Sequence, residues 1–394
     1  MNYVNSSEVL PKELIDEIRK YVDGVYIYIP VNEDRKFVRV NSERQQGLVI
    51  RNRRIYNDYL SGKTYIDIAN QYFLSEKSVR RIVLEKKREM GIRMEKLTEA
   101  LKGWDLQGEL KQINDTPWCV DDQYVVKEYH EMSMLRRNAD VFRALCSVGI
   151  PVPEVVQTIE GRDFYEMDGK GFLVTKKLKG SKIEDVHALT DDWFYRFGKT
   201  IGELHRGFNQ CQDSLNYWNN SLLTEMRGWV SDNLEKYRPD FLDVSDAQFE
   251  VNRLSGVYNA LPKQLIHRDV HLGNFLFEGE AFTGYVDFDL SQSNIRIFDL
   301  CYFLMGLVCK ESGRKDYDER WFTIVKEVTL GYDEVMSLSH IEKQSMPIVM
   351  MNIELLFCAY FLGQDDPLPL GSAVFQQLVV FANNFSRVKM LCSS

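Results

Sequence analysis

One stretch of the chain, residues 265–300, constrains the fold more than any other. It reads LIHRDVHLGNFLFEGEAFTGYVDFDLSQSNIRIFDL, with histidine, aspartate and asparagine set between short apolar runs. The runs FLF and YVDF flank a turn-like EGEAFTG, which predicts a β-hairpin. A helix is predicted to begin by Asp299. The stretch therefore places its polar residues in a loop, at the end of a hairpin and at a helix start.

The polar residues of this stretch are of the kinds that phosphoryl transfer requires. Asp269 and Asn274 are separated by four residues, so one loop presents the carboxylate to an incoming hydroxyl while the amide turns toward a metal ion. The hairpin then delivers Asp287 beside Asn274. Because Mg²⁺ prefers one or two carboxylates with phosphate and water oxygens, Asn274, Asp287 and ATP form a sufficient ligand set.

The same stretch resembles the aminoglycoside phosphotransferases and their relatives, namely choline kinase, type II homoserine kinase and the CotS-like spore-coat kinases. The resemblance rests on Asp269 and Asn274, on His271 two residues after the aspartate, on the VDFD strand end and on Asp299. It implies an α+β, bilobal fold of the protein-kinase type, with a small, mostly antiparallel β N-lobe and a large helical C-lobe.

The resemblance also implies roles for individual side chains. Asp269 would act as the base or orient the hydroxyl, Asn274 and Asp287 would hold Mg²⁺, and His267 and Asp299 would brace the catalytic loop. Only eleven residues separate Asp287 from Asp299, which leaves no room for the long activation segment of a protein kinase. A small-molecule acceptor is therefore favoured over a protein substrate.

Residues 95–180 are predicted to form the N-lobe. GELKQI, WCV and QYVVKEY read as strands, MSMLRRNADVFRALCSVG reads as a helix, and FLVTKKLKG resembles the strand and hinge between lobes. Strand alternation turns Lys127 away from Val126 and toward a nucleotide, the alternative being an exposed strand lysine. The predicted nucleotide contacts are Lys127, Thr116 in the loop after the first strand, and the backbone near Lys177 and Leu178.

Three positions depart from the family pattern. Asn138 stands where the helix of the N-lobe normally supplies a glutamate that pairs with the lysine, which leaves Asp140 or Glu131 as substitutes in another register. Arg268 replaces a residue that is more often glycine. The loop that contains Thr116 has no glycine. Asp289 is a candidate for a further metal or hairpin ligand.

The region between residues 46 and 93 is locally basic, with eleven Lys and Arg against five Asp and Glu. RNRRIYNDYL, TYIDIANQYF and SEKSVRRIVLEKKREM predict three helices joined by short turns. The pattern resembles the helix-turn-helix of Mor-type and resolvase-type regulators, with Ala69 at the helix crossing, Ser75 as N-cap, and Phe73 where glycine is common. The predicted interior residues are Ile66, Ile68, Val79 and Ile82.

In a DNA-binding interpretation, the third helix enters a major groove. Lys77, Ser78 and Arg81 would face bases, and Arg80 would face phosphates together with Lys86 and Lys87. The alternative is a protein-docking module whose basic face is only solvated. A net charge of −9 for the whole chain argues against a general nucleic-acid coat.

These observations predict three domains: a helix-turn-helix domain at 1–94, an N-lobe at 95–180 and a C-lobe at 181–394. The first residues lack an export signal and the seven cysteines include no CxxC pair, so we expect a cytoplasmic chain with reduced thiols. Within the C-terminal tail, MPIVMMNIELLFCAYFLG is expected to be core and not membrane, because Asn352 and Glu354 interrupt it. His205, on a predicted helix at 193–208, is expected to be structural.

Two functional hypotheses follow. The first is an ATP- and Mg²⁺-dependent phosphotransferase that acts on a hydroxyl of an aminoglycoside, a choline-like compound or another metabolite, coupled to DNA binding. The second is a DNA-binding regulator whose kinase-like domain senses a ligand without turnover. The oligomeric state is not predicted.

Overall fold

The computed structural model describes residues 48, 51–113, 116–240, 242–311 and 317–363, and the structural statements below concern these residues. The chain divides into two compact units, Met1–Val49 and Ile50–Ser394. Apart from residue 48, the first unit lies outside the described residues, as do the last 31 positions from 364 to 394.

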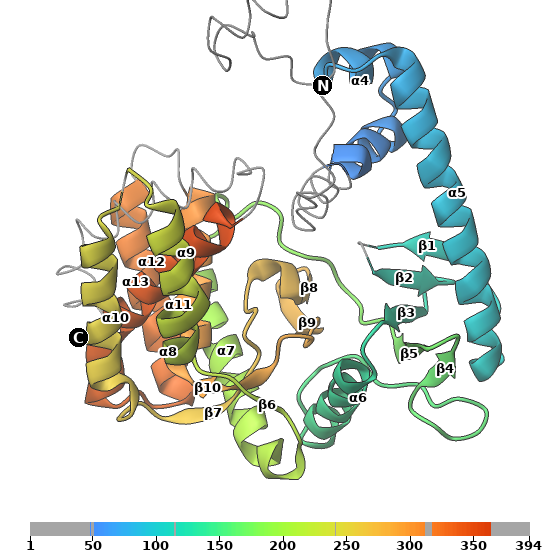
Figure 1. Cartoon of the computed structure of the whole chain (residues 1–394). Helices are drawn as coiled ribbons and strands as arrows, with labels where there is room; N and C mark the ends of the chain where they lie inside the picture. Colours follow the sequence, from blue (N-terminus) through green and yellow to red (C-terminus); the bar gives the residue numbers. More distant parts are fainter. Residues whose placement is uncertain (1–47, 49–50, 114–115, 241, 312–316, 364–394) are drawn as a thin grey trace, which may run out of the picture. The chain divides into compact units, whose positions relative to one another are not determined.

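The N-lobe is built around a five-stranded antiparallel sheet in the order β1-β2-β3-β5-β4 (Figure 1). Its alternation is the one that the sequence predicts, since Val126 is fully buried while Lys127 faces a cavity. Helix α6 packs beside β3 and β5. The elements are β1 (Leu110–Gln112), β2 (Pro117–Val120), β3 (Tyr124–Tyr129), α6 (Met132–Ser147), β4 (Tyr165–Met167) and β5 (Lys170–Lys176).

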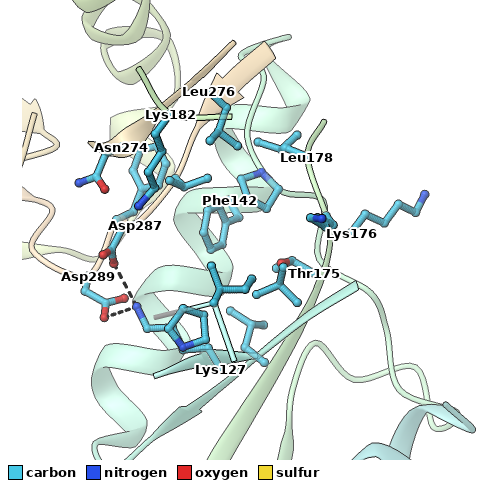
Figure 2. A pocket seen from close by; sticks show the side chains of 18 of the residues that line it. Lys127, Phe142, Thr175, Lys176, Leu178, Lys182, Asn274, Leu276, Asp287 and Asp289 are labelled. Atoms are coloured by element: carbon cyan, nitrogen blue, oxygen red, sulfur yellow. Dashed lines mark hydrogen bonds and ion pairs between the residues drawn. The ribbon is translucent and has the colours of Figure 1, made fainter. Parts of the chain in front are cut away.

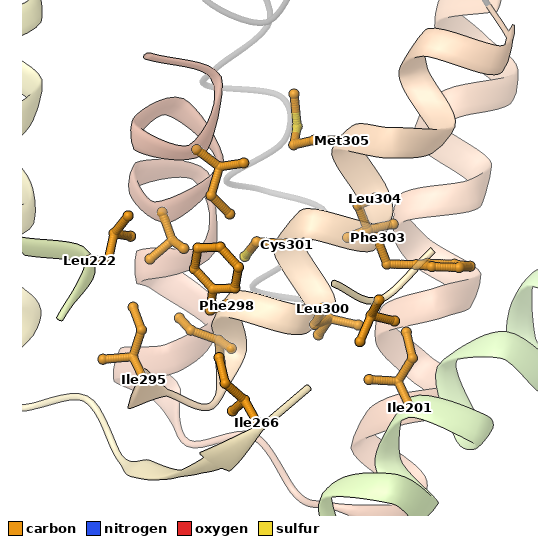
Figure 3. Close-up of a cluster of buried hydrophobic side chains, with 14 of the residues drawn as sticks. Ile201, Leu222, Ile266, Ile295, Phe298, Leu300, Cys301, Phe303, Leu304 and Met305 are labelled. Atoms are coloured by element: carbon orange, nitrogen blue, oxygen red, sulfur yellow. The ribbon is translucent and has the colours of Figure 1, made fainter. Parts of the chain in front are cut away.

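The C-lobe is mainly helical, and its large apolar core surrounds α11 (Figure 3). Two small sheets lie in it: a three-stranded sheet in the order β6-β10-β7, and the predicted hairpin β8–β9. The helices are α7 (Asp191–Cys211), α8 (Leu222–Glu225), the π-helix η4 (Met226–Val230), α9 (Ser231–Tyr237), α10 (Val244–Tyr258), α11 (Ile297–Glu311), α12 (Tyr317–Val335) and α13 (His340–Leu362). Short 3-10 turns are η3 (Gln212–Ser214) and η5 (Leu272–Asn274), and the strands are β6 (Trp218–Asn219), β7 (Lys263–Ile266), β8 (Phe275–Glu278), β9 (Ala281–Tyr285) and β10 (Gln292–Ile295).

The two lobes together confirm the predicted α+β, bilobal kinase-like fold. Helix α13 is the one described helix long and apolar enough to cross a membrane, yet 72% of its apolar window is buried inside the protein. Asn352 and Glu354 are themselves buried, and a capping box between Ser339 and Glu342 fixes the start of the helix. Burial of polar groups among packed helices is typical of a core helix, as the sequence predicts.

Three helices precede the N-lobe: residues 51–60, α4 (Tyr65–Gln71) and α5 (Glu76–Leu101). Ile55, Ile68 and Val79 are fully buried between them. The expectation for Ile66 is wrong, because this side chain is 59% exposed on the outer face of α4. Phe73 adopts a left-handed conformation with φ 52°, so it takes the backbone geometry that glycine usually supplies at such a turn.

Helix α5 is longer than predicted and is shared by two cores. Its first half packs in the three-helix cluster, and its last turns place Leu97, Ala100 and Leu101 against Trp118 and Val126 of the sheet. The predicted boundary after residue 94 therefore falls inside a continuous helix.

Two glycines set the distance between α7 and α12, the most extensively packed helix pair of the C-lobe. A Cβ atom added at Gly198 would lie 2.0 Å from the carbonyl oxygen of Val328, and one added at Gly331 would lie 1.9 Å from that of Tyr195. Because no heavy atom tolerates such a distance, only glycine allows the two backbones to approach this closely.

We expect Gly198→Ala and Gly331→Ala each to lower the free energy of unfolding by about 1–3 kcal/mol or more, because the helices must separate. Chemical denaturation measures this change. Gly256→Ala in α10 is the matched control, since no atom lies within 4 Å of the added Cβ. There, alanine is expected to be neutral or mildly stabilising. Equal effects at all three positions would contradict the close-packing explanation.

Candidate functional site

A cavity of about 300 Å³ lies between the N-lobe sheet, the segment that follows β5, and the β8–β9 hairpin (Figure 2). Apolar side chains such as Val125, Phe142 and Leu276 line much of it. Its polar groups include Lys127 from β3, and Asn274 and Asp287 from the two ends of the hairpin. An apolar slot with a charged end suits a flat base joined to phosphates.

Lys127 is held by two carboxylates at the charged end of the cavity. Its Nζ lies 3.0 Å from Oδ1 of Asp287 and 2.5 Å from Oδ2 of Asp289 (Figure 2). Burial opposes the charged form of the lysine, but the charges of Asp289 and Asp287 outweigh it and raise the pKa of Lys127. The lysine therefore stays a cation, which is the state that binds phosphate.

Asp269 is the centre of a hydrogen-bonded group beside the cavity. Nδ2 of Asn274 donates to its carbonyl oxygen at 2.9 Å and approaches its Oδ2 at 3.3 Å. The hydroxyl of Tyr302 donates to Oδ1 at 2.8 Å, and Nε2 of His271 lies 3.5 Å from Oδ2. Burial alone would raise the pKa of Asp269, but His271 and Tyr302 outweigh it and hold the pKa at about 2.

A buried carboxylate accepts hydrogen bonds from the backbone of the loop that leads to Asp269. Asp299 at the start of α11 is fully buried and accepts the backbone N–H groups of His267 at 2.8 Å and Arg268 at 2.9 Å. His205 adds a third contact, because its Nε2 lies 3.0 Å from Oδ2 of Asp299. The side chain of His205 is fully buried, which agrees with the structural role expected for it.

His267 links the loop to the hairpin. Its Nδ1 accepts the N–H of Asp269 at 3.3 Å, so the ring carries its proton on Nε2, which lies 3.1 Å from the carbonyl oxygen of Val286. Because Val286 immediately precedes Asp287, this one ring fixes the separation between the loop and the end of the hairpin. His267 thus contacts both the loop and the hairpin, and Asp299 contacts the loop.

Arg268 occupies the left-handed region with φ 73°, which is the conformation that a glycine adopts readily. Its largely buried guanidinium lies 2.6 Å from Oε2 of Glu225 and 4.0 Å from the ring of Phe298. Burial lowers the pKa of the arginine, and Glu225 partly offsets that loss. Arginine at this position thus ties the catalytic loop to α8.

The segment after β5 forms one wall of the cavity. Lys177 and Leu178 both line it, as predicted for a hinge. The N–H of Lys177 donates to Gln123 at 2.8 Å, whereas that of Leu178 has no hydrogen-bond partner among the described residues. Gly180 has φ 95°, and a Cβ there would lie 2.6 Å from the carbonyl oxygen of Phe277, so glycine lets the segment run against β8.

Thr116 is exposed and is not among the residues that line the cavity, although Ile113 and Pro117 on either side of its loop are. Asn114 and Asp115 lie outside the described residues. The structure therefore brings Lys127, Lys177, Leu178, Asn274 and Asp287 to the cavity but leaves Thr116 at its rim.

Tyr302, the hydroxyl donor to Asp269, is not among the residues predicted from the sequence. The signal was present, because Tyr302 follows Asp299 by three residues on a helix and so lies one turn along the same face. Lys182, which lines the cavity, is also not among them, since a lysine in a loop has no periodic pattern to identify it.

The residues proposed for DNA contact lie on α5, away from the cavity. Ser78 donates its N–H to the N-cap Ser75 at 3.1 Å. The guanidinium group of Arg80 forms an ion pair with Oε1 of Glu76 at 2.6 Å, and its Cζ lies 4.7 Å from the centre of the Tyr65 ring. Arg81 lies 3.9 Å from Glu85, and Lys77 has no ionic or hydrogen-bonded partner among the described residues.

We expect Tyr302→Phe to raise the pKa of Asp269 from about 2 toward its ordinary value of 3.8. At a pH above its ordinary pKa, the ionised carboxylate of Asp269 stabilises the folded state. This stabilisation is lost as the pH falls through the pKa of the group in the folded protein. The variant should therefore be less stable than the wild type by roughly 1 kcal/mol near neutral pH, a difference that shrinks toward pH 2. Carboxyl NMR titration measures the pKa directly, and an unchanged value would contradict the role of the tyrosine.

Comparison with known proteins identifies the family. Residues 109–332 match the model of the phosphotransferase enzyme family. The homoserine kinase of Methylobacillus glycogenes is 24% identical over 241 residues, which make up 57% of this chain and 72% of that kinase. The structure of an amicoumacin kinase in complex with AMP-PNP, Ca²⁺ and Ami has a TM-score of 0.59 and 19% identity over 76% of this chain and 96% of that one. At that identity the likeness shows the fold alone.

A second similarity concerns a shorter protein. Bacillus subtilis YraL, an uncharacterized protein, is 36% identical over 88 residues, which are 22% of this chain and all of YraL. The similarity to YraL extends over fewer residues of this chain than the match to the phosphotransferase family does. Since the family match spans more than half of the chain and contains the loop, hairpin and lysine described above, this chain belongs to the phosphotransferase enzyme family and is a small-molecule kinase that phosphorylates a hydroxyl group.

Proposed function

We propose that the chain transfers the γ-phosphoryl group of ATP, in complex with Mg²⁺, to a hydroxyl of a small metabolite or antibiotic. The observation that carries this proposal is the charged end of the cavity, where the cation of Lys127 lies beside the oxygen-bearing Asn274 and Asp287. An adenine fits the apolar part, and its edge would meet the N–H of Leu178.

The donor set fits Mg²⁺. Asn274 is 4% exposed and sits opposite Asp287 across the hairpin ends, so an amide and a carboxylate are available together with phosphate oxygens. When bound, the ion would neutralise the charge of the transferring phosphates. Lys127 would contact the phosphates that remain on the leaving nucleotide.

Asp269 is proposed to orient the acceptor hydroxyl more than to activate it. With a pKa of about 2, its carboxylate is fully ionised but is a weak base at neutral pH. Phosphoryl transfer has a loose transition state in which the hydroxyl proton becomes acidic only late, so a weakly basic acceptor suffices. Tyr302 and His271 hold the carboxylate in place, and the proton would pass to it as the new P–O bond forms.

The acceptor is expected to be a small hydroxylated compound. Relatives named homoserine kinase and solved kinases of antibiotics and of aminopropanol give the first compounds to test. A panel of homoserine, aminopropanol, choline and aminoglycosides covers these classes.

We expect Asp269→Asn to reduce turnover about 10²–10⁴-fold, because the hydroxyl loses its acceptor and orienting group. Release of ADP in the presence of each compound of the panel measures the loss. Asp163→Asn, which removes a partly exposed partner of Arg143 in the N-lobe, is the matched control and should leave turnover unchanged. If the wild type binds a compound but turns over none, the kinase-like domain acts as a ligand sensor.

A second proposed function is DNA binding by the three-helix module. The buried Ala69 on α4 and the Ser75 cap on α5 support this proposal, as does Lys77, which has no ionic or hydrogen-bonded partner among the described residues.

We expect Lys77→Ala and Arg81→Ala each to weaken binding to a cognate genomic fragment by about 1–3 kcal/mol, since both project from the predicted recognition helix. A gel-shift titration at several salt concentrations measures affinity and its salt dependence. Lys102→Ala, on the 3-10 turn η2 (Lys102–Trp104) after α5, is the charge-matched control. If none of the three substitutions changes the affinity for DNA, or if the wild-type protein does not bind DNA, direct readout of bases by α5 is contradicted.

A further inference from the structure

The N-lobe helix offers no carboxylate to Lys127. Asn138 on α6 stands at the position where a glutamate was expected, and its side chain is 2% exposed. An amide cannot balance the charge of a buried lysine. Glu131 and Asp140, the substitutes considered from the sequence, do not form the ion pair, because the carboxylates at Nζ belong to Asp287 and Asp289.

The contacts of Asn138 lead to the lysine through Asp289. Nδ2 of Asn138 donates to Oδ1 of Asp289 at 2.6 Å, and Nζ of Lys127 donates to Oδ2 of the same carboxylate at 2.5 Å. The hydroxyl of Tyr129 approaches Oδ1 at 3.3 Å. One carboxylate from the C-lobe thus bridges the helix and the strand of the N-lobe.

Both oxygens of Asp289 are therefore occupied by protein donors. Coordination of an ion by Asp289 would compete with its contacts to the amide of Asn138 and the ammonium group of Lys127. Asp287, by contrast, is half-exposed and has a single ionic partner among the described residues. The geometry separates the two aspartates of the VDFD strand end, with Asp287 available to a metal and Asp289 committed to the lysine.

We propose that Asp289, positioned by Asn138 and Tyr129, is the counter-ion that holds Lys127 in place for the nucleotide phosphates, in the role that a helix glutamate would otherwise fill. The inference rests on the proposed function, because it assumes that Lys127 meets phosphates. Without Asp289, Lys127 would pair with Asp287 alone and would compete with the metal for that carboxylate. Asp289 is accordingly a positioning residue and not a metal ligand.

The test compares the binding of ADP and of adenosine by calorimetry in the absence of divalent metal. Wild-type protein should bind ADP more tightly than adenosine, and Lys127→Met should abolish this difference. Asp289→Asn is expected to weaken ADP binding about tenfold while leaving adenosine binding unchanged, because only the phosphate contact is disturbed. Asn138→Leu should weaken ADP binding in the same direction by a smaller factor.

Relocating the charge gives the decisive variant. In Asp289→Asn combined with Asn138→Glu, the carboxylate is moved to α6, on a side chain one methylene longer than that of Asn138, which lies on the opposite side of Asp289 from Lys127. ADP affinity and the KM for ATP should recover to within about threefold of the wild type, whereas a lost metal ligand would not be restored from that position. Asp163→Asn serves as the control for an N-lobe ion pair, and thermal unfolding checks each variant.

The outcomes separate this inference from the proposed function. If wild-type protein does not prefer ADP to adenosine, the proposed nucleotide site itself is wrong. If the wild type prefers ADP and Lys127→Met does not, but Asp289→Asn binds ADP normally, the counter-ion role is overturned. It is likewise overturned if the double variant fails to recover and Asp289→Asn raises the Mg²⁺ concentration needed for turnover, since that is the behaviour of a metal ligand.

Discussion

The arrangement of the site depends on one buried carboxylate, that of Asp299. An isolated charge in the interior is strongly unfavourable, and Asp299 is tolerated because two backbone amides of the catalytic loop and the ring of His205 satisfy it. The same contacts fix the loop at His267 and Arg268, immediately before Asp269. Burial of this charge thus gives the Asp269 carboxylate, the proposed orienting group for the acceptor, a defined position.

A second constraint joins the two lobes at Lys127. The lysine belongs to the N-lobe sheet, and both of its carboxylate partners follow the hairpin of the C-lobe. Because both carboxylates belong to the C-lobe, the position of the lysine depends on where the segment after the hairpin lies beside the N-lobe sheet. The cluster of Lys127, Asp287 and Asp289 therefore both joins the two lobes at the cavity and contains the lysine that would contact phosphate.

The sequence predicts the local parts of this site better than its distant pairings. Asp269, Asn274 and Asp287 lie within one loop and hairpin, so their spacing and turn residues suffice to bring them together. The contact between Asn138 and Asp289 spans 151 positions and has no periodic signal, so the sequence indicates Asp289 only as a candidate metal or hairpin ligand. Ile66 was misplaced because apolar spacing alone does not distinguish the inner from the outer face of a seven-residue helix.

Helix α5 shows why domain boundaries are the hardest feature to predict. The sequence predicts a third helix that ends at residue 90 and a domain boundary after residue 94, yet α5 continues to Leu101. Gly91 within it disfavours a helix by about 1 kcal/mol, and burial of Leu97, Ala100 and Leu101 against the sheet more than offsets that cost. The helix also brings Arg93 within 3.7 Å of Glu128, the neighbour of Lys127 on β3. Helix α5 is therefore one continuous element that contributes side chains both to the three-helix core and to the core of the N-lobe sheet.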